Sequence, residues 1–109
     1  MNNTVIIENI LKENCINFIK KFKLKYKTSY REYDFYLPEK NILIEADGDF
    51  WHGNPKKYNT NTLLEVQKSN IENDLLKDKL AIENNKKVIR FWESDIILPT
   101  FKDILLKNI

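Results

Sequence analysis

The sequence predicts an α/β fold, a single-domain mixed β-sheet flanked by helices in the order αββ–loop–αβα. Two observations predict it. Apolar residues recur at three- and four-residue spacing in two long segments, as in amphipathic helices, and alternate with polar residues in shorter segments, as in strands. Because the chain has 109 residues and no internal repeat, we expect residues 1–109 to form one domain.

The first predicted element is a helix over residues 4–22, which Asn2, Asn3 or Thr4 can cap. Its apolar residues recur at helical spacing. They are Ile7, Leu11, Cys15, Phe18, Ile19 and Phe22. A lysine-rich stretch, residues 20–27, leads from this helix into an aromatic strand.

Two strands are predicted next, over residues 29–37 and 42–47, because polar and apolar residues alternate in both. Residues 38–41 have turn composition. If they form a four-residue loop, the two strands pair as a hairpin with Leu37 opposite Ile42.

A long irregular loop is predicted over residues 48–62, which contain both glycines of the chain. Loops of this length are usually functional or disordered. A second helix follows over residues 63–84, and we expect its buried stripe to consist of Leu64, Ile71, Leu75 and Ile82. A strand over residues 87–93 and a short helix after Thr100 complete the predicted order.

Composition excludes several classes of protein. The chain has 18 Lys and Arg against 16 Asp and Glu, a net charge of +2, which excludes a histone-like polycation but permits a local basic face. Its one cysteine, Cys15, excludes an internal disulfide and a structural zinc site built on cysteines. Without a basic signal region or a long apolar run, we expect a cytoplasmic, intracellular protein with no membrane partner.

The predicted hairpin gathers carboxylates. With Leu37 opposite Ile42, Asp34 lies opposite Glu45, and Asp47 shares their face. Opposed like charges destabilise a sheet unless a cation lies between them, and Mg²⁺ prefers carboxylate oxygens. The alternative interpretation is a polar face that is simply solvated.

The only histidine of the chain, His52, follows this acidic cluster directly, beside Phe50 and Trp51. A histidine can transfer a proton or orient a water near neutral pH, and aromatic side chains on a loop can wedge between bases. In the alternative interpretation, the histidine is structural and the two aromatic side chains belong to the core.

These segments resemble the core of very short patch repair (Vsr) endonucleases, in which a catalytic Asp precedes a Gly-x-Phe-Trp-His run; here they are Asp34-Phe35 and residues 42–52. The similarity covers about residues 6–95. It includes residues 6–11, the Lys68-x-Asn70-x₃-Asp74 spacing and the strand over residues 88–93. The resemblance implies the PD-(D/E)XK nuclease fold, in which Mg²⁺ held by acidic residues supports cleavage of a DNA phosphodiester.

The resemblance also implies roles for individual residues. Asp34 is the expected principal metal ligand, His52 lies near the attacking water, and Glu8 reaches the site from the first helix. The predicted hairpin register adds Glu45 and Asp47 as metal ligands beside Asp34. The expected DNA-facing residues are Phe50, Trp51, Lys56, Lys57, Lys68 and Asn70. For each lysine, a solvated surface position is the alternative interpretation.

Departures from the family favour a particular subgroup. Asp47 stands where the repair enzymes usually carry His, Glu45 stands where they carry an apolar residue, and the zinc-binding cysteines are missing. These features favour the Vsr-like EDxHD homing endonucleases that accompany introns and inteins, especially in phages. We therefore expect a Mg²⁺-dependent DNA endonuclease of homing or nicking type.

Three alternatives stay open at this point. A mismatch or patch-repair nicking enzyme would act on duplex DNA as a monomer. A Holliday-junction-resolvase-like nuclease would act as a symmetric homodimer. A non-catalytic DNA-binding module would have kept the fold without cutting.

Overall fold

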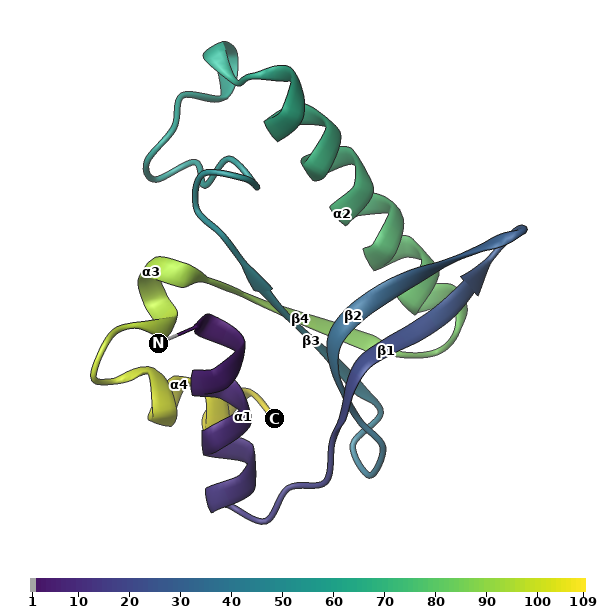
Figure 1. The fold of residues 1–109 in the computed structure, drawn as a ribbon, viewed down its shortest axis with the longest axis vertical. Helices are drawn as coiled ribbons and strands as arrows, with labels where there is room; N and C mark the ends of the chain where they lie inside the picture. The colour runs from purple at the N-terminus through teal and green to yellow at the C-terminus, as the bar shows by residue number, and fades with distance from the viewer. Residues whose placement is uncertain (1) are drawn as a thin grey trace.

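A computed structural model describes residues 2–109 and places them in a four-stranded mixed sheet flanked by helices (Figure 1). The elements are α1 (Asn3–Glu13), β1 (Ile19–Tyr26), β2 (Ser29–Leu37), β3 (Ile42–Asp47), η1 (Thr60–Thr62), α2 (Glu65–Glu83), β4 (Lys87–Trp92), α3 (Glu93–Ile96) and α4 (Phe101–Asn108). The strand order is β1-β2-β3-β4. The first two pairings are antiparallel and the third is parallel. The predicted α/β class is confirmed.

The helix expected over residues 4–22 is too long, and a whole strand was missed. Asn2 caps the start of α1 by accepting a hydrogen bond from the Thr4 N–H. The helix ends at Glu13, where Asn14 donates from its backbone and side chain to the Ile10 carbonyl. Cys15 then takes a φ of 54° and is exposed, because it lies beyond the Asn14 cap that ends the helix.

The lysine-rich stretch forms the missed strand, β1. From Phe22 its side chains alternate between the core and solvent, with Leu24 buried and Lys23 and Lys25 exposed. This period of two is the pattern of a half-buried strand. The observed order therefore begins αβββ instead of αββ.

The predicted hairpin is confirmed. Both strands have the expected bounds, and Leu37 pairs with Ile42 as expected. The ladder between β2 and β3 is short, however, because it ends at Phe35↔Ile44. Beyond that pair β2 diverges from β3 and keeps only β1 as its strand partner.

Two apolar clusters lie on opposite sides of the sheet. Phe35 and Leu37 pack with α1, α3 and α4, whereas Tyr33 and Leu24 pack with α2. Tyr33 and Phe35 are two residues apart on one strand and would normally share a face. The hairpin therefore turns over between them, at the level where Lys21 on β1 has a φ of 52°.

The apolar stripe expected on the second helix is wrong except at Ile71, which is partly buried. Leu75 and Ile82 are 64% and 72% exposed, and Leu64 is exposed too. The buried residues of α2 are instead Gln67, Lys77, Leu80 and Ala81. The reason is the surface beneath the helix: α2 covers the acidic end of β3, so polar and charged side chains make the contact.

Within residues 2–109, every helix is too short or too polar to traverse a lipid bilayer.

The left-handed backbone at Lys21 yields a stability prediction. A Cβ in this conformation costs about 1–2 kcal/mol, whereas glycine adopts it freely. We expect Lys21→Gly to raise the free energy of unfolding by about 0.5–1 kcal/mol in chemical denaturation. Lys23→Gly is the matched control. It lies in the same strand without a positive φ, so it should lower the free energy by about 0.5–1 kcal/mol. Equal losses in both variants would contradict the prediction.

Candidate functional site

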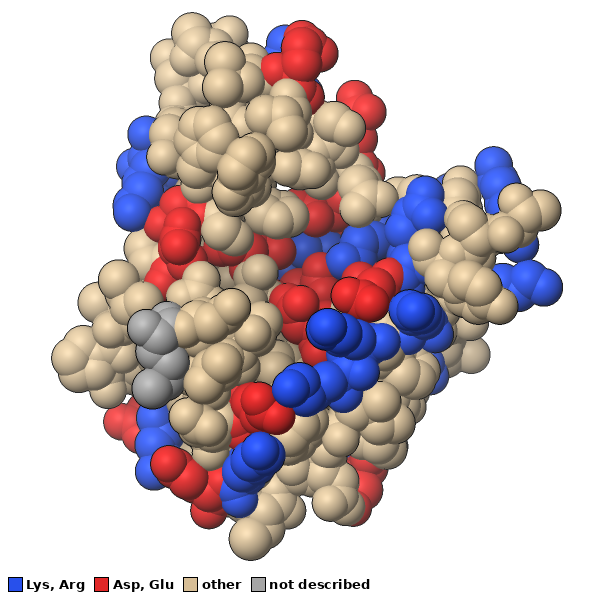
Figure 2. Space-filling model, in the orientation of Figure 1, with Lys and Arg blue, Asp and Glu red and all other residues tan. Residues whose placement is uncertain are grey.

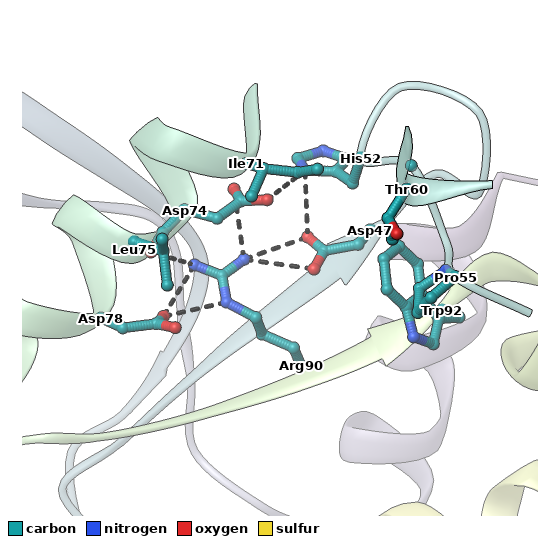
Figure 3. A pocket seen from close by; sticks show the side chains of 11 residues that line it. Asp47, His52, Pro55, Thr60, Ile71, Asp74, Leu75, Asp78, Arg90 and Trp92 are labelled. Carbon is teal, nitrogen blue, oxygen red and sulfur yellow. Dashed lines mark hydrogen bonds and ion pairs between the residues drawn. The ribbon is translucent and has the colours of Figure 1, made fainter. Parts of the chain in front are cut away.

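The acidic groups meet at the end of β3, beside the middle of α2 (Figure 3). Asp47 ends β3, His52 lies in the following loop and Asp74 lies on α2. One ligand atom from each of these three residues lies within 4.8 Å of the others. His52 Nδ1 is 2.5 Å from Asp74 Oδ2 and 3.9 Å from Asp47 Oδ1.

Arg90 of β4 is the cation at the centre of this group. Its Nη1 is 3.1 Å from Asp47 Oδ1 and 3.5 Å from Asp74 Oδ1. Its Nη2 is 2.8 Å from Asp78 Oδ1, and Glu45 lies 3.7 Å from Nη1. Burial alone would lower the pKa of Arg90, but the hydrogen bond to Asp78 and the charges of Asp47 and Asp74 raise it above its usual value. One guanidinium is thus shared by four carboxylates.

Asp34 and Glu45 face each other across the point where β2 leaves β3. The Asp34 N–H donates to Glu45 Oε1 at 2.7 Å, and the Ala46 N–H donates to Asp34 Oδ2 at 2.8 Å. These two side chains replace the backbone ladder that has ended at Phe35. They satisfy N–H groups that would otherwise lose their partners.

Lys77 of α2 is the second cation of the site. Its Nζ is 2.5 Å from Glu45 Oε2, and both side chains are buried. Burial raises the pKa of Glu45 to about 7, against the lowering effect of Lys77. Burial also raises the pKa values of Asp34 and Asp47.

The predicted cluster of three carboxylates is only partly the cluster that the structure shows. Asp34 lies against Glu45, and Glu45 and Asp47 both contact Arg90. Among residues 2–109, however, the ligand atoms that converge belong to Asp47, His52 and Asp74.

Glu8 has its own partners. On α1 its carboxylate lies 3.2 Å from Lys20 and 3.6 Å from Lys12. The hydrogen bond from Lys20 lowers the pKa of Glu8, although burial opposes it. The contacts of this side chain therefore tie α1 to β1 instead of joining it to the acidic cluster.

The loop after β3 is held by hydrogen bonds. Asn54 donates to Asp49 at 3.0 Å, and Gln67 and Asn70 of α2 donate to the carbonyls of Phe50 and Trp51. Asn70, expected to face DNA, thus supports the loop. Gly53 is required there, since its φ is 59° and a Cβ would lie 3.0 Å from Leu63.

This loop presents two aromatic side chains to solvent. Trp51 is 57% exposed and Phe50 is 37% exposed, and their rings meet edge to face at 5.1 Å. Of the expected phosphate contacts, Lys56 is exposed, Lys57 lies 2.9 Å from Asp49 and Lys68 lies 3.4 Å from Glu65.

The acidic group borders a pocket of about 300 Å³. Asp47, His52, Asp74, Asp78 and Arg90 form its charged part. Its other lining side chains are largely apolar: Pro55, Thr60, Ile71, Leu75 and Trp92. A site of this kind has a charged end that fixes orientation and an apolar wall that excludes water.

Sequence reasoning missed Lys77, Asp78 and Arg90. One signal was present for Arg90, which is one of only two arginines in the chain. Its register with Glu45 is seen only in the structure. The other signal was the spacing of polar residues on α2. Residues 67, 70, 74 and 77 recur every three or four positions, so the polar face of this helix is its docking face.

The donor set suits a divalent cation. Four carboxylates, of Glu45, Asp47, Asp74 and Asp78, surround the cations Arg90 and Lys77, and His52 contacts two of them. Asp34 adds a further carboxylate, and no residue in 2–109 donates a hydrogen bond to its Oδ1. Carboxylate oxygens suit Mg²⁺ or Mn²⁺, and an imidazole nitrogen suits softer metals.

No protein-family model matches the sequence, and no curated protein matches it either.

The protonation of His52 can be tested directly, because it is the only histidine of the chain. The hydrogen bond to Asp74 raises the pKa of His52 above 6.5, burial opposes this, and the charge of Asp47 adds to it. A ¹H–¹⁵N NMR titration in EDTA should therefore give a pKa above 6.5. Asp74→Asn should lower it, whereas Asp78→Asn, the matched control one helical turn away, should change it little.

The sign of the stability effect follows from the same shift. Since the pKa is higher in the folded state than in the unfolded state, His52 stabilises the fold below pH 6.5. This contribution is lost as the pH rises through the folded-state pKa. A pKa at or below 6.5 in the wild type, or an unchanged value in Asp74→Asn, would contradict the assignment.

Proposed function

We propose that this chain is a metal-dependent DNA endonuclease of the Vsr-like type within the PD-(D/E)XK superfamily, acting as a homing or nicking enzyme. The observation that carries the proposal is the convergence of Asp47, His52 and Asp74 within 4.8 Å, beside the facing pair Asp34 and Glu45. The resemblance of residues 34–35 and 42–52 to Vsr endonucleases supplies the reaction class.

Asp47 is the proposed central metal ligand. It belongs both to the carboxylate set predicted from the hairpin register, with Asp34 and Glu45, and to the converging set, with His52 and Asp74. The oxygen donors of the carboxylate set suit Mg²⁺, whereas among residues 2–109 the ligand atoms that lie within 4.8 Å of one another belong to Asp47, His52 and Asp74. A bound Mg²⁺ supplies positive charge to a phosphate and lowers the pKa of a bound water.

His52 is the proposed proton acceptor. Its Nδ1 lies 2.5 Å from Asp74, and since an ionised carboxylate only accepts, Nδ1 carries the proton. The lone pair of the neutral ring is then on Nε2, which can accept a proton from the attacking water. Asp74 holds the ring in this tautomer and stabilises its protonated form, the usual role of a carboxylate behind a catalytic histidine.

Phe50 and Trp51 are the proposed DNA contacts of the loop. Their exposure, and the hydrogen bonds from Gln67 and Asn70 to the carbonyls of this pair, support a wedge between bases. In this proposal the loop positions duplex DNA over the acidic pocket, with Lys56 and Lys68 close to the backbone phosphates.

One observation favours a second candidate, a non-catalytic DNA-binding module. Arg90 already bridges Asp47 and Asp74 with short contacts. A guanidinium in this position balances carboxylates without any metal, as a purely structural site would require. Metal-dependent cleavage therefore decides between the two candidates.

The cleavage test uses supercoiled plasmid and branched DNA with Mg²⁺, Mn²⁺ or EDTA. We expect nicking only with metal, and a loss of about 100-fold or more in Asp47→Asn, typical of removing one group that stabilises the transition state. Asp103→Asn, an exposed acid on α4 outside the site, is the matched control and should keep full activity.

Metal binding separates the two ligand sets. In a Mn²⁺ titration, Asp34→Asn should weaken binding if the carboxylate set holds the ion, whereas Asp74→Asn should weaken cleavage more than binding.

No cleavage of any DNA with either metal, or metal-dependent cleavage that Asp47→Asn leaves unchanged, would refute the proposed active site.

The aromatic loop gives an independent prediction. Stacking of a base on an aromatic side chain contributes about 1–3 kcal/mol, so Trp51→Ala should weaken duplex binding in EDTA by about 5- to 150-fold in fluorescence anisotropy. Leu98→Ala removes an exposed apolar side chain far along the chain and should leave affinity unchanged. Equal affinity of Trp51→Ala and wild type would exclude the wedge.

A further inference from the structure

The β1–β2 hairpin projects from the rest of the sheet (Figure 1). The two strands pair from Ile19↔Tyr36 to Tyr26↔Ser29, but β2 pairs with β3 only over residues 35–37. The outer half of the hairpin, residues 22–33, is therefore a two-stranded ribbon. Its two strands pair with each other and with no other strand in residues 2–109.

One face of this ribbon is covered by α2. Leu24 and Tyr33 are buried in the cluster that includes Leu80 and Ala81 of the helix. The Tyr33 hydroxyl donates to the Lys77 carbonyl at 2.7 Å. These contacts fix the ribbon to the body of the protein, so the arm has a defined direction.

The opposite face carries a row of lysines. Lys21, Lys23 and Lys25 are exposed at alternate positions of β1, and Lys27 follows in the turn. None of these four lysines makes an ion pair with any residue in 2–109. Figure 2 shows basic side chains gathered at this end of the molecule.

The charge of the ribbon is opposite to that of the rest of the chain. Residues 20–33 contain six of the 18 Lys and Arg and one acid, Glu32, which lies opposite Lys23 in the hairpin; twelve cationic and fifteen acidic residues remain elsewhere. Like charges on neighbouring positions of one sheet face repel. A polyanion would relieve this repulsion along the whole row.

From these observations we infer that the lysine face of the β1–β2 hairpin is a binding arm for the phosphate backbone of duplex DNA. A two-stranded β-ribbon has the dimensions that enter the DNA major groove. Lysines at alternate strand positions are about 6.8 Å apart, so a rigid row can contact successive phosphates. The arm positions DNA and does not read its sequence.

The arm also points to the candidate site. In the register of the hairpin, Lys21 lies between the pairs Lys20↔Phe35 and Phe22↔Tyr33, at the level of Asp34. The lysine row therefore starts at the strand level of Asp34 and runs outward to the turn. The inference shares with the proposed function only the choice of DNA as partner, because backbone binding by the arm requires no metal and no cleavage.

The test is duplex binding as a function of salt, in EDTA, by fluorescence anisotropy with a labelled duplex of arbitrary sequence. In Lys23→Gln/Lys25→Gln/Lys27→Gln, the slope of log K against log salt should fall in magnitude by about 0.9 for each lost phosphate contact, about 2.7 in all. Affinity at moderate salt should fall at least tenfold.

The matched control is Lys87→Gln/Lys102→Gln/Lys107→Gln, which removes the same charge from exposed positions outside the hairpin. It should keep a slope close to that of the wild type. Circular dichroism melts of both triple variants report folding, and reversal of the hairpin effect by arginine at the same three positions reports charge instead of shape.

Three outcomes would overturn the inference: an unchanged slope in the hairpin variant, an equal loss in the control, or binding to vesicles with anionic lipid without binding to DNA. Failure of the nuclease proposal would look different. A protein that cuts no DNA but loses duplex binding in the hairpin variant would keep the arm and lose the active site.

Discussion

The guanidinium of Arg90 is the contact on which the arrangement of this protein depends. It joins β4 to Asp47 of β3 and to Asp74 and Asp78 of α2, so three elements meet at one cation. Apolar packing holds α2 to the sheet at few points, since Leu80 and Ala81 are the only buried apolar side chains of this helix. Buried ion pairs contribute little to stability compared with apolar packing. Their presence under a helix whose Leu75 and Ile82 face solvent shows that charge pairing, and not apolar packing alone, joins α2 to the sheet.

The second constraint is the early divergence of β2 from β3. A ladder that continued past Phe35 would have occupied the backbone groups that Asp34 and Glu45 now satisfy. Because side chains take over these hydrogen bonds, the two carboxylates are held close together in a buried setting. The same divergence frees the outer hairpin from the sheet. The turn-over at Lys21 then directs its apolar face to α2 and its lysines to solvent.

A net charge of +2 conceals this separation. Acidic side chains concentrate where β3, β4 and α2 meet, while lysines concentrate on the ribbon. The charges of the acidic patch and of the lysine patch nearly cancel in the net charge, but the two patches can act on one polyanion in different ways. A lysine row attracts phosphates at long range, whereas an acidic pocket accepts a phosphate only together with a cation.

Local patterns in the sequence determined the class of fold, the bounds of β2 and β3, and the register that brings Asp34 to Glu45, because strand alternation and turn composition act over a few residues. They failed for β1, where phenylalanines at residues 18 and 22 imitated helical spacing, and for α2, where the apolar stripe is exposed. Only the tertiary structure decided that Asp74, Lys77 and Arg90 join the site. These residues lie far apart in the chain, and their pairing depends on which face of α2 meets β3. The face of α2 that meets β3 carries the partners of the charged groups at the end of the sheet. These charged groups come together only when the strands have assembled, so no single segment of the sequence predicts them.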